Sequence, residues 1–88
     1  MPATEPYEYE DGWYVQTVSE RAKRRLKSYT AFCAEADAPR GDCGEEVDVR
    51  AMGPAPAKRI VADVLAKDYM PGMKVRRLVF RPDGFMFF

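Results

Sequence analysis

The chain has 88 residues, of which 47% are hydrophobic and 12% aromatic, and its formal net charge at pH 7 is +0. This length is that of one small domain, and the apolar content is too high for a disordered chain. No apolar stretch approaches the roughly 20 residues needed to cross a bilayer, and the N-terminus lacks the pattern of a secretory signal. With two cysteines, no disulfide framework is visible. These features favour a cytoplasmic protein without membrane contact.

The neutral total conceals charges that alternate in sign along the chain. Residues 1–11 carry four acids and no base, and residues 12–30 carry five bases and one acid. Residues 31–53 carry six acids and two bases, and residues 54–88 carry seven bases and three acids. If each block occupies its own part of the surface, the folded domain is strongly bipolar. Such local patches steer partners more than the summed charge does.

The N-terminal block differs in character from the rest of the chain. Residues 1–11 combine prolines and glutamates with two tyrosines, which is typical of a flexible acidic arm. Residues 12–88 are predicted to form a single folded domain. Its first element is the run of aromatic and β-branched residues at 13–18, which predicts a strand.

The next segment supports two interpretations. Ser19 can cap a short basic helix within residues 19–27, whereas residues 26–36 also suit a pleated strand. We therefore expect a short helix or turn followed by a strand. After a turn-rich stretch, valine and alanine alternate with charged residues over 46–52, which is the pattern of a half-buried strand. These two strands are predicted to form a hairpin.

The most regular element is a helix predicted over residues 57–69. Apolar side chains recur there at i, i+3, i+4 and i+7, and Pro71-Gly72 ends the helix. Residues 74–81 and 85–88 flank a tight turn and predict a terminal hairpin. The order of elements predicts an α+β domain of two layers, in which an antiparallel sheet of about four to five strands packs on one main helix.

The residue inventory argues against catalysis. The chain has no histidine, which is the commonest general acid or base and a frequent metal ligand. Cys33 and Cys43 cannot form a four-ligand zinc site without carboxylates, and their separation across a turn matches no usual ligand spacing. Glu45 and Glu46 form a charged pair at a strand entrance, which is more often solvated surface than an acid–base pair. We expect no enzyme activity, no metal and no cofactor.

Two basic clusters raise nucleic acid binding as an alternative function. Residues 21–27 hold five lysines and arginines, and residues 74–81 hold four beside Phe80. Such clusters suit contacts with phosphates. A dedicated nucleic acid binder usually has a basic total, however, whereas the sequence pI of this chain is about 6.2.

Surplus apolar surface points to a protein partner. If Phe85 and Phe87 seal the core from one face of a strand, Met86 and Phe88 lie on the other face, which favours a partner or a homodimer. Aromatic and arginine side chains are the usual energetic anchors of interfaces. The predicted partner contacts are Tyr7, Glu8, Tyr9, Glu10, Trp13, Arg24, Arg25, Arg76 and Arg77.

The run Ala57-Lys58-Arg59-Ile60 opens a helix that follows one strand and precedes a hairpin. Over residues 47–80 this order resembles the β-α-β-β plan of some small phage-encoded inhibitors of the anti-CRISPR kind. The resemblance implies a protein that blocks a larger host protein or nucleoprotein complex by contact. The sequence therefore predicts a non-enzymatic protein-binding module, and the resemblance implies that it acts as an inhibitor. The alternative function is nucleic acid binding.

Overall fold

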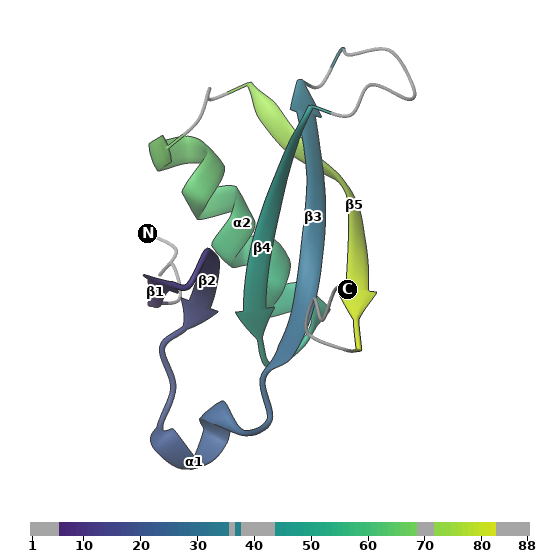
Figure 1. Ribbon diagram of the computed structural model, residues 1–88. Helices are drawn as coiled ribbons and strands as arrows, with labels where there is room; N and C mark the ends of the chain where they lie inside the picture. Colours follow the sequence, from purple (N-terminus) through teal and green to yellow (C-terminus); the bar gives the residue numbers. More distant parts are fainter. Residues whose placement is uncertain (1–5, 36, 38–43, 69–71, 83–88) are drawn as a thin grey trace.

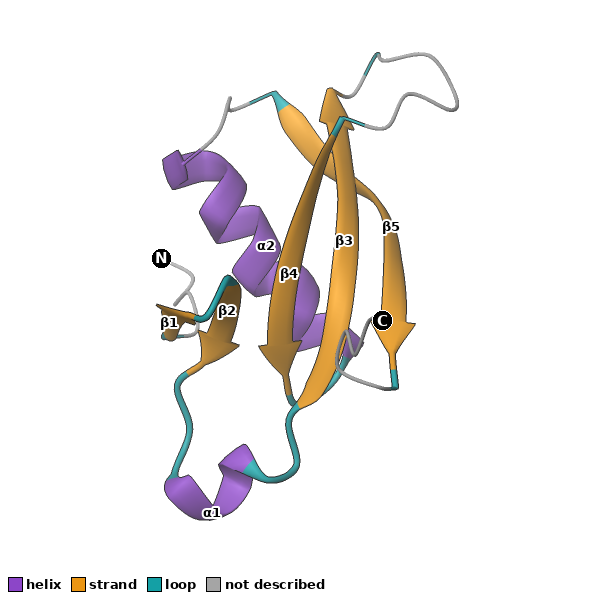
Figure 2. Cartoon of the chain, viewed as in Figure 1, coloured by secondary structure: helices purple, strands orange, loops and turns teal. Residues whose placement is uncertain are grey.

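The computed structural model describes residues 6–35, 37, 44–68 and 72–82 (Figure 1). In chain order the elements are β1 (Tyr7–Glu10), β2 (Trp13–Gln16), α1 (Glu20–Lys23), β3 (Lys27–Glu35), β4 (Glu45–Ala51), α2 (Pro54–Asp68) and β5 (Met73–Arg81). The strands form one sheet in the order β1-β2-β4-β3-β5, and α2 lies across one face (Figure 2). The predicted two-layer α+β domain is confirmed. Neither described helix is long and apolar enough to cross a membrane.

The core lies between α2 and the middle of the sheet. The buried stripe of the helix consists of Ala57, Ile60, Val61, Val64 and Leu65. The sheet residues that face it are Tyr29, Ala31 and Cys33 of β3 and Val47, Val49 and Ala51 of β4. The helix begins at Pro54, three residues earlier than predicted, because prolines are tolerated in the first turn, where the missing N–H groups have no partner to lose.

β3 is the central strand, and it pairs antiparallel with β4 on one side and β5 on the other. The predicted β3–β4 hairpin is thus confirmed. Gly44, which leads into β4, has a φ of +56°, a conformation that side-chain-bearing residues rarely adopt. A Cβ at this position would also clash with the carbonyl oxygen of Cys33. Gly44 is therefore required for the two strands to approach as they do.

Residues 7–10, which are expected from the sequence to belong to a flexible acidic arm, join the sheet. Residues 7–10 form β1, which pairs antiparallel with β2. The turn between the strands is formed by Asp11 and Gly12, with φ values of 50° and 84°. Two consecutive positive φ values suit the tight type I′ turns that match strand twist, and Asp-Gly is a preferred sequence for them.

The sheet is mixed, because β2 runs parallel to β4 while the other pairs are antiparallel. The chain from β2 to β3 does not make a hairpin. It passes beneath the end of β4 through α1 (Figure 1). Ser19 caps this short helix by accepting a hydrogen bond from the backbone N–H of Ala22 at 3.3 Å. The short helix expected within residues 19–27 is confirmed, as is the strand after it.

A β-bulge decides which side chains of β5 face α2. Leu78 and Val75 both pack against the core although they are three positions apart, because Arg76 is an extra residue that the register with β3 skips. Met73 then lies on the same side as Val75, and all three apolar residues remain half-buried. Residues 85–88, predicted as the second strand of a terminal hairpin, lie outside the described residues.

Replacing Gly44 with Ala is expected to destabilise the protein by about 2 kcal/mol or more, because the added Cβ meets backbone atoms in a left-handed conformation. Urea denaturation of the reduced protein, followed by circular dichroism, measures the change. Gly72→Ala is the control, since a Cβ there meets nothing within 4 Å, and it should change stability by less than about 1 kcal/mol. If the Gly44→Ala variant is as stable as the wild type, the geometry described for the β3–β4 hairpin is wrong.

Candidate functional site

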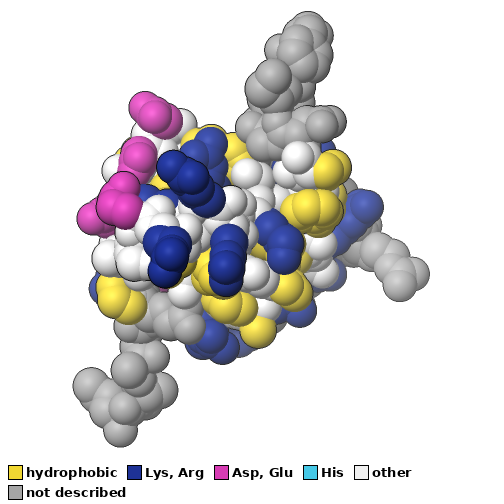
Figure 3. All heavy atoms as spheres, turned by 90° about the horizontal axis from the view of Figure 1, so that it is seen from below, with side chains coloured by type: hydrophobic (Ala, Val, Ile, Leu, Met, Phe, Trp, Pro, Cys, Tyr) yellow, Lys and Arg dark blue, Asp and Glu magenta, His cyan; other side chains and the backbone are white. Residues whose placement is uncertain are grey.

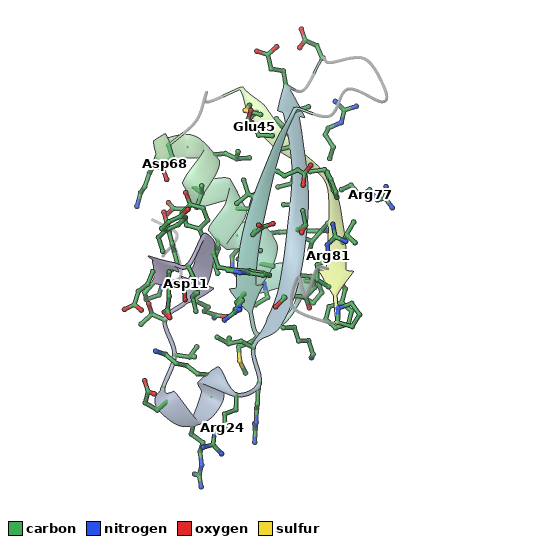
Figure 4. The ribbon with its side chains drawn as sticks, in the orientation of Figure 1. Asp11, Arg24, Glu45, Asp68, Arg77 and Arg81 are labelled. Carbon is green, nitrogen blue, oxygen red and sulfur yellow. The ribbon has the colours of Figure 1, made fainter. Side chains whose placement is uncertain are left out.

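The two edges of the sheet carry opposite charge. The acids at the β1 edge are Glu8, Glu10 and the turn residue Asp11. The bases at the β5 edge are Lys74, Arg76, Arg77 and Arg81. Figure 4 shows Asp11 and Arg77 on opposite sides of the sheet. Among the described strands, β1 and β5 each have one neighbour, so each presents a second row of backbone N–H and C=O groups that no described strand pairs with.

A groove runs between α2 and β5. Its larger part, of about 400 Å³, is lined by Lys58, Ala62, Leu65, Ala66, Met73, Lys74 and Val75. A second hollow of about 280 Å³ is lined by Pro54, Lys58, Val75, Arg76, Arg77 and Leu78. The two hollows share Lys58 and Val75, so they are contiguous along the strand. The groove thus combines apolar lining residues with charged ones that are all basic.

The outer face of the sheet, which is turned away from α2, holds arginines over aromatic rings. The guanidinium of Arg50 lies 4.7 Å from the centre of the Trp13 ring, and that of Arg77 lies 6.0 Å from the centre of the Phe32 ring. Such cation–π contacts stabilise the arginine positions. Trp13, predicted as a partner contact, is only 7% exposed. It is the one buried residue of the predicted set.

A hydrogen-bond chain crosses the same face from β5 to β4. Arg81 Nε donates to Thr30 Oγ1 at 3.1 Å, and Thr30 Oγ1 donates to Asp48 Oδ1 at 3.2 Å. Burial raises the pKa of Asp48, and the hydrogen bond from Thr30 acts in the opposite direction. The chain holds Arg81 against the sheet at the end of β5.

Tyrosine side chains connect the β1–β2 hairpin to α2 through ring contacts and hydrogen bonds. The rings of Tyr7 and Tyr9 lie 5.7 and 4.8 Å from that of Tyr14, in edge-on arrangements. The hydroxyl of Tyr14 donates to Asp68 Oδ2 at 3.3 Å. Burial, together with a hydrogen bond and repulsion from the Asp63 carboxylate, raises the pKa of Tyr7 to about 12. Tyr7 is therefore neutral at ordinary pH and is not an activated nucleophile.

The structure distributes the other predicted contacts over three surfaces. Exposed at the β1 edge are Glu8, Tyr9 and Glu10, with Tyr7 half-buried; exposed at the β5 edge are Arg76 and Arg77; exposed beside α1 are Arg24 and Arg25. Figure 3, viewed from the α1 end, shows basic side chains spread across this face and an acidic group at one side. The predicted set therefore does not form one continuous patch.

Nothing in the described part of the chain gathers for metal or thiol chemistry. No group of three His, Cys, Asp or Glu residues within it could hold a metal ion. Cys33 is buried, and burial raises the pKa of its thiol to about 11, so the reactive thiolate is scarce. No known protein family, curated protein or solved structure matches this chain.

The groove is the feature that the sequence does not reveal. Its lining residues Met73, Val75 and Leu78 follow no regular alternation, because the bulge at Arg76 changes the face on which later residues lie. The available signal was the pair of adjacent arginines, Arg76-Arg77, which interrupts the strand pattern. Bulges are frequent at sheet edges, and an extra residue of this kind shifts the alternation of the residues that follow it.

The raised pKa of Tyr7 predicts a loss of stability at high pH. The folded-state pKa of about 12 lies above the ordinary value of 10.0, so folding favours the neutral phenol. The contribution of the Tyr7 phenol to the free energy of unfolding is present in full below pH 10 and is lost as the pH rises toward 12. The free energy of unfolding should therefore fall more steeply across this range in the wild type than in Tyr7→Phe.

Urea denaturation at a series of pH values measures the two slopes. Tyr7→Phe keeps the ring and removes only the titrating hydroxyl. Cys33 titrates in a similar range but is present in both proteins, so its effect cancels. Parallel curves for the two proteins would contradict the placement of Tyr7 beside Asp63.

Proposed function

We propose that the protein is a non-catalytic binding module that accepts an extended segment of a partner protein along the outer edge of β5. The observation that carries the proposal is the groove between α2 and β5, which lies beside an edge strand bearing four basic residues. Addition of a strand to an exposed sheet edge is a recurrent mode of peptide recognition, in which main-chain hydrogen bonds supply affinity and side-chain pockets supply specificity.

The two faces of β5 define the chemistry of the accepted segment. Successive side chains of an added strand point to opposite faces of the sheet. Those on the helix side meet the groove, with Met73, Val75 and Leu78 in its lining. Those on the outer face meet Arg77 and Arg81. The segment that fits best therefore alternates apolar or aromatic residues with acidic ones.

Charge makes this edge selective. No acidic residue is among the described residues that line the groove, so a basic segment is repelled and an acidic one is attracted. If the accepted segment belongs to a larger complex, its capture blocks that complex by contact. This is the inhibitory role that the resemblance to phage-encoded inhibitors implies.

Selection from a random peptide display library tests the proposed function without a known partner. The immobilised wild-type protein should enrich sequences that alternate apolar and acidic residues. The affinity of the selected peptides, measured by fluorescence anisotropy, should fall about tenfold or more in the double variant Arg76→Glu/Arg77→Glu, because two attractive charges become repulsive.

The double variant Arg24→Glu/Arg25→Glu is the matched control. It reverses two exposed arginines beside α1 and leaves β5 unchanged, so it should bind the selected peptides with wild-type affinity. Circular dichroism establishes that both variants are folded. Enrichment of sequences without this alternation, or equal weakening by the two variants, would show that the binding surface is elsewhere.

A second candidate function, nucleic acid binding, is favoured by how the basic clusters meet. Ser28 at the start of β3 pairs with Arg81 at the end of β5. Arg81, the last residue of the cluster at 74–81, therefore lies near the cluster at 21–27 at the α1 end of the molecule, where Figure 3 shows many basic side chains. A basic surface of this kind suits phosphate contacts.

If this second function holds, fluorescein-labelled duplex DNA or RNA binds the protein, and the affinity falls linearly with salt on a logarithmic scale as counterions are released. Arg24→Glu/Arg25→Glu should then weaken binding more than Arg76→Glu does alone, because it reverses two charges. An absence of any anisotropy change at about 50 mM salt would exclude this candidate.

A further inference from the structure

We propose that β1 of a second copy of this chain is a strand that β5 accepts, so that copies join head to tail into one continuous sheet. The inference rests on the proposed function, because it names a partner for the same edge of β5. β1 forms the opposite edge of the sheet and alternates tyrosine with glutamate over Tyr7–Glu10. That alternation combines the aromatic and acidic side chains that the end of β5 favours, where Phe80 lies on the helix side and Arg77 and Arg81 lie on the outer face.

The strand directions fit this arrangement. β1 is antiparallel to β2, β2 is parallel to β4, and β4 and β5 are both antiparallel to β3. β1 and β5 therefore run in opposite directions. When two sheets continue side by side in the same orientation, β5 of one copy lies antiparallel to β1 of the next, and α2 lies on the same side in both. Antiparallel pairing is the more stable of the two ladder types.

A row of paired residues on the helix side ends in exposed aromatic rings at both edges. In sheet order the row is Tyr9, Tyr14, Val49, Tyr29 and Phe80. Tyr9 is 65% exposed and Phe80 is 50% exposed. Continuing the row into a second copy places Tyr9 of that copy beside Phe80. Both rings then lose exposed surface in an aromatic cross-strand pair.

The adjacent row on the outer face ends in opposite charges. In sheet order it is Glu8, Val15, Arg50, Ser28 and Arg81. The same continuation places Glu8 of the second copy opposite Arg81. Glu10 then lies diagonally between Arg81 and Arg77, within reach of long side chains. The ends of both rows are thus complementary in a single register.

Charge also opposes the other ways of joining two edges. Two β1 edges would set glutamate against glutamate, and two β5 edges would set arginine against arginine. The head-to-tail contact uses two different surfaces, so it does not close on a two-fold axis. Strand twist rotates each five-stranded copy by about 100–125° relative to the last. A growing ribbon, rather than a closed dimer, is the expected product.

Sedimentation velocity with charge-swapped variants tests the proposal in reducing, low-salt buffer, over about 10 μM to about 1 mM protein because a short edge contact is weak. The wild-type sedimentation coefficient should rise with concentration. Glu8→Lys/Glu10→Lys and Arg77→Glu/Arg81→Glu should each stay monomeric alone. An equimolar mixture should associate again, because each swapped edge then finds an opposite charge.

Restored association between two variants that circular dichroism shows to be folded distinguishes edge pairing from a loss of folding. The single variant Arg77→Glu keeps the hydrogen bond from Arg81 to Thr30, and its self-association should be weaker than that of the wild type. The variant Arg24→Glu/Arg25→Glu should self-associate as the wild type does. A wild type that stays monomeric at every concentration, or a mixture that fails to associate, overturns the inference. If the wild type stays monomeric while selected acidic peptides still bind β5, the proposed function stands and only this partner is excluded.

Discussion

One helix has to cover a sheet of five strands, and this mismatch in width shapes the rest of the molecule. An α-helix with its side chains is about 10–12 Å across, whereas five strands at about 4.8 Å spacing span about 19 Å between the outermost backbones. α2 therefore seals the middle of the sheet, where Ala31, Cys33, Val47 and Val49 are almost fully buried. The apolar sides of both edge strands are left partly uncovered.

The apolar sides of the two edge strands are covered to different degrees. At the β1 edge, tyrosines lean toward the helix, and the phenols of Tyr7 and Tyr14 reach the carboxylates Asp63 and Asp68. Large amphipathic rings thus bridge the gap that the narrow helix leaves. At the β5 edge the bulge turns Met73 and Val75 toward α2, but no aromatic side chain of the described residues lines the space beside the helix. A groove remains, and basic residues surround it.

Local patterns were sufficient for the parts of the fold that depend on the middle of the sheet. The helix and the β3–β4 hairpin show regular periodicity, because each buries one face against the other. The sequence analysis does not predict β1, because the glutamates of Tyr7–Glu10 are typical of a solvent-exposed segment without regular structure. The pair Asp11-Gly12 that follows is nevertheless a signal for a β-hairpin turn. The parallel pairing of β2 with β4 depends on the path that the chain takes beneath the end of β4. No local sequence pattern predicts that path. The groove is not predicted by periodicity, because it depends on the bulge at Arg76, which the sequence marks only by the adjacent arginines Arg76-Arg77.

Amide hydrogen exchange of β5, measured with and without a selected acidic peptide, tests whether the outer edge of this strand accepts another strand. In an added strand, alternate amides of β5 that point away from β3 form new hydrogen bonds, so their exchange should slow when the peptide binds. The amides around α1 should be unaffected. Protection confined to α1 or to the β1 edge, with β5 unchanged, would contradict the account.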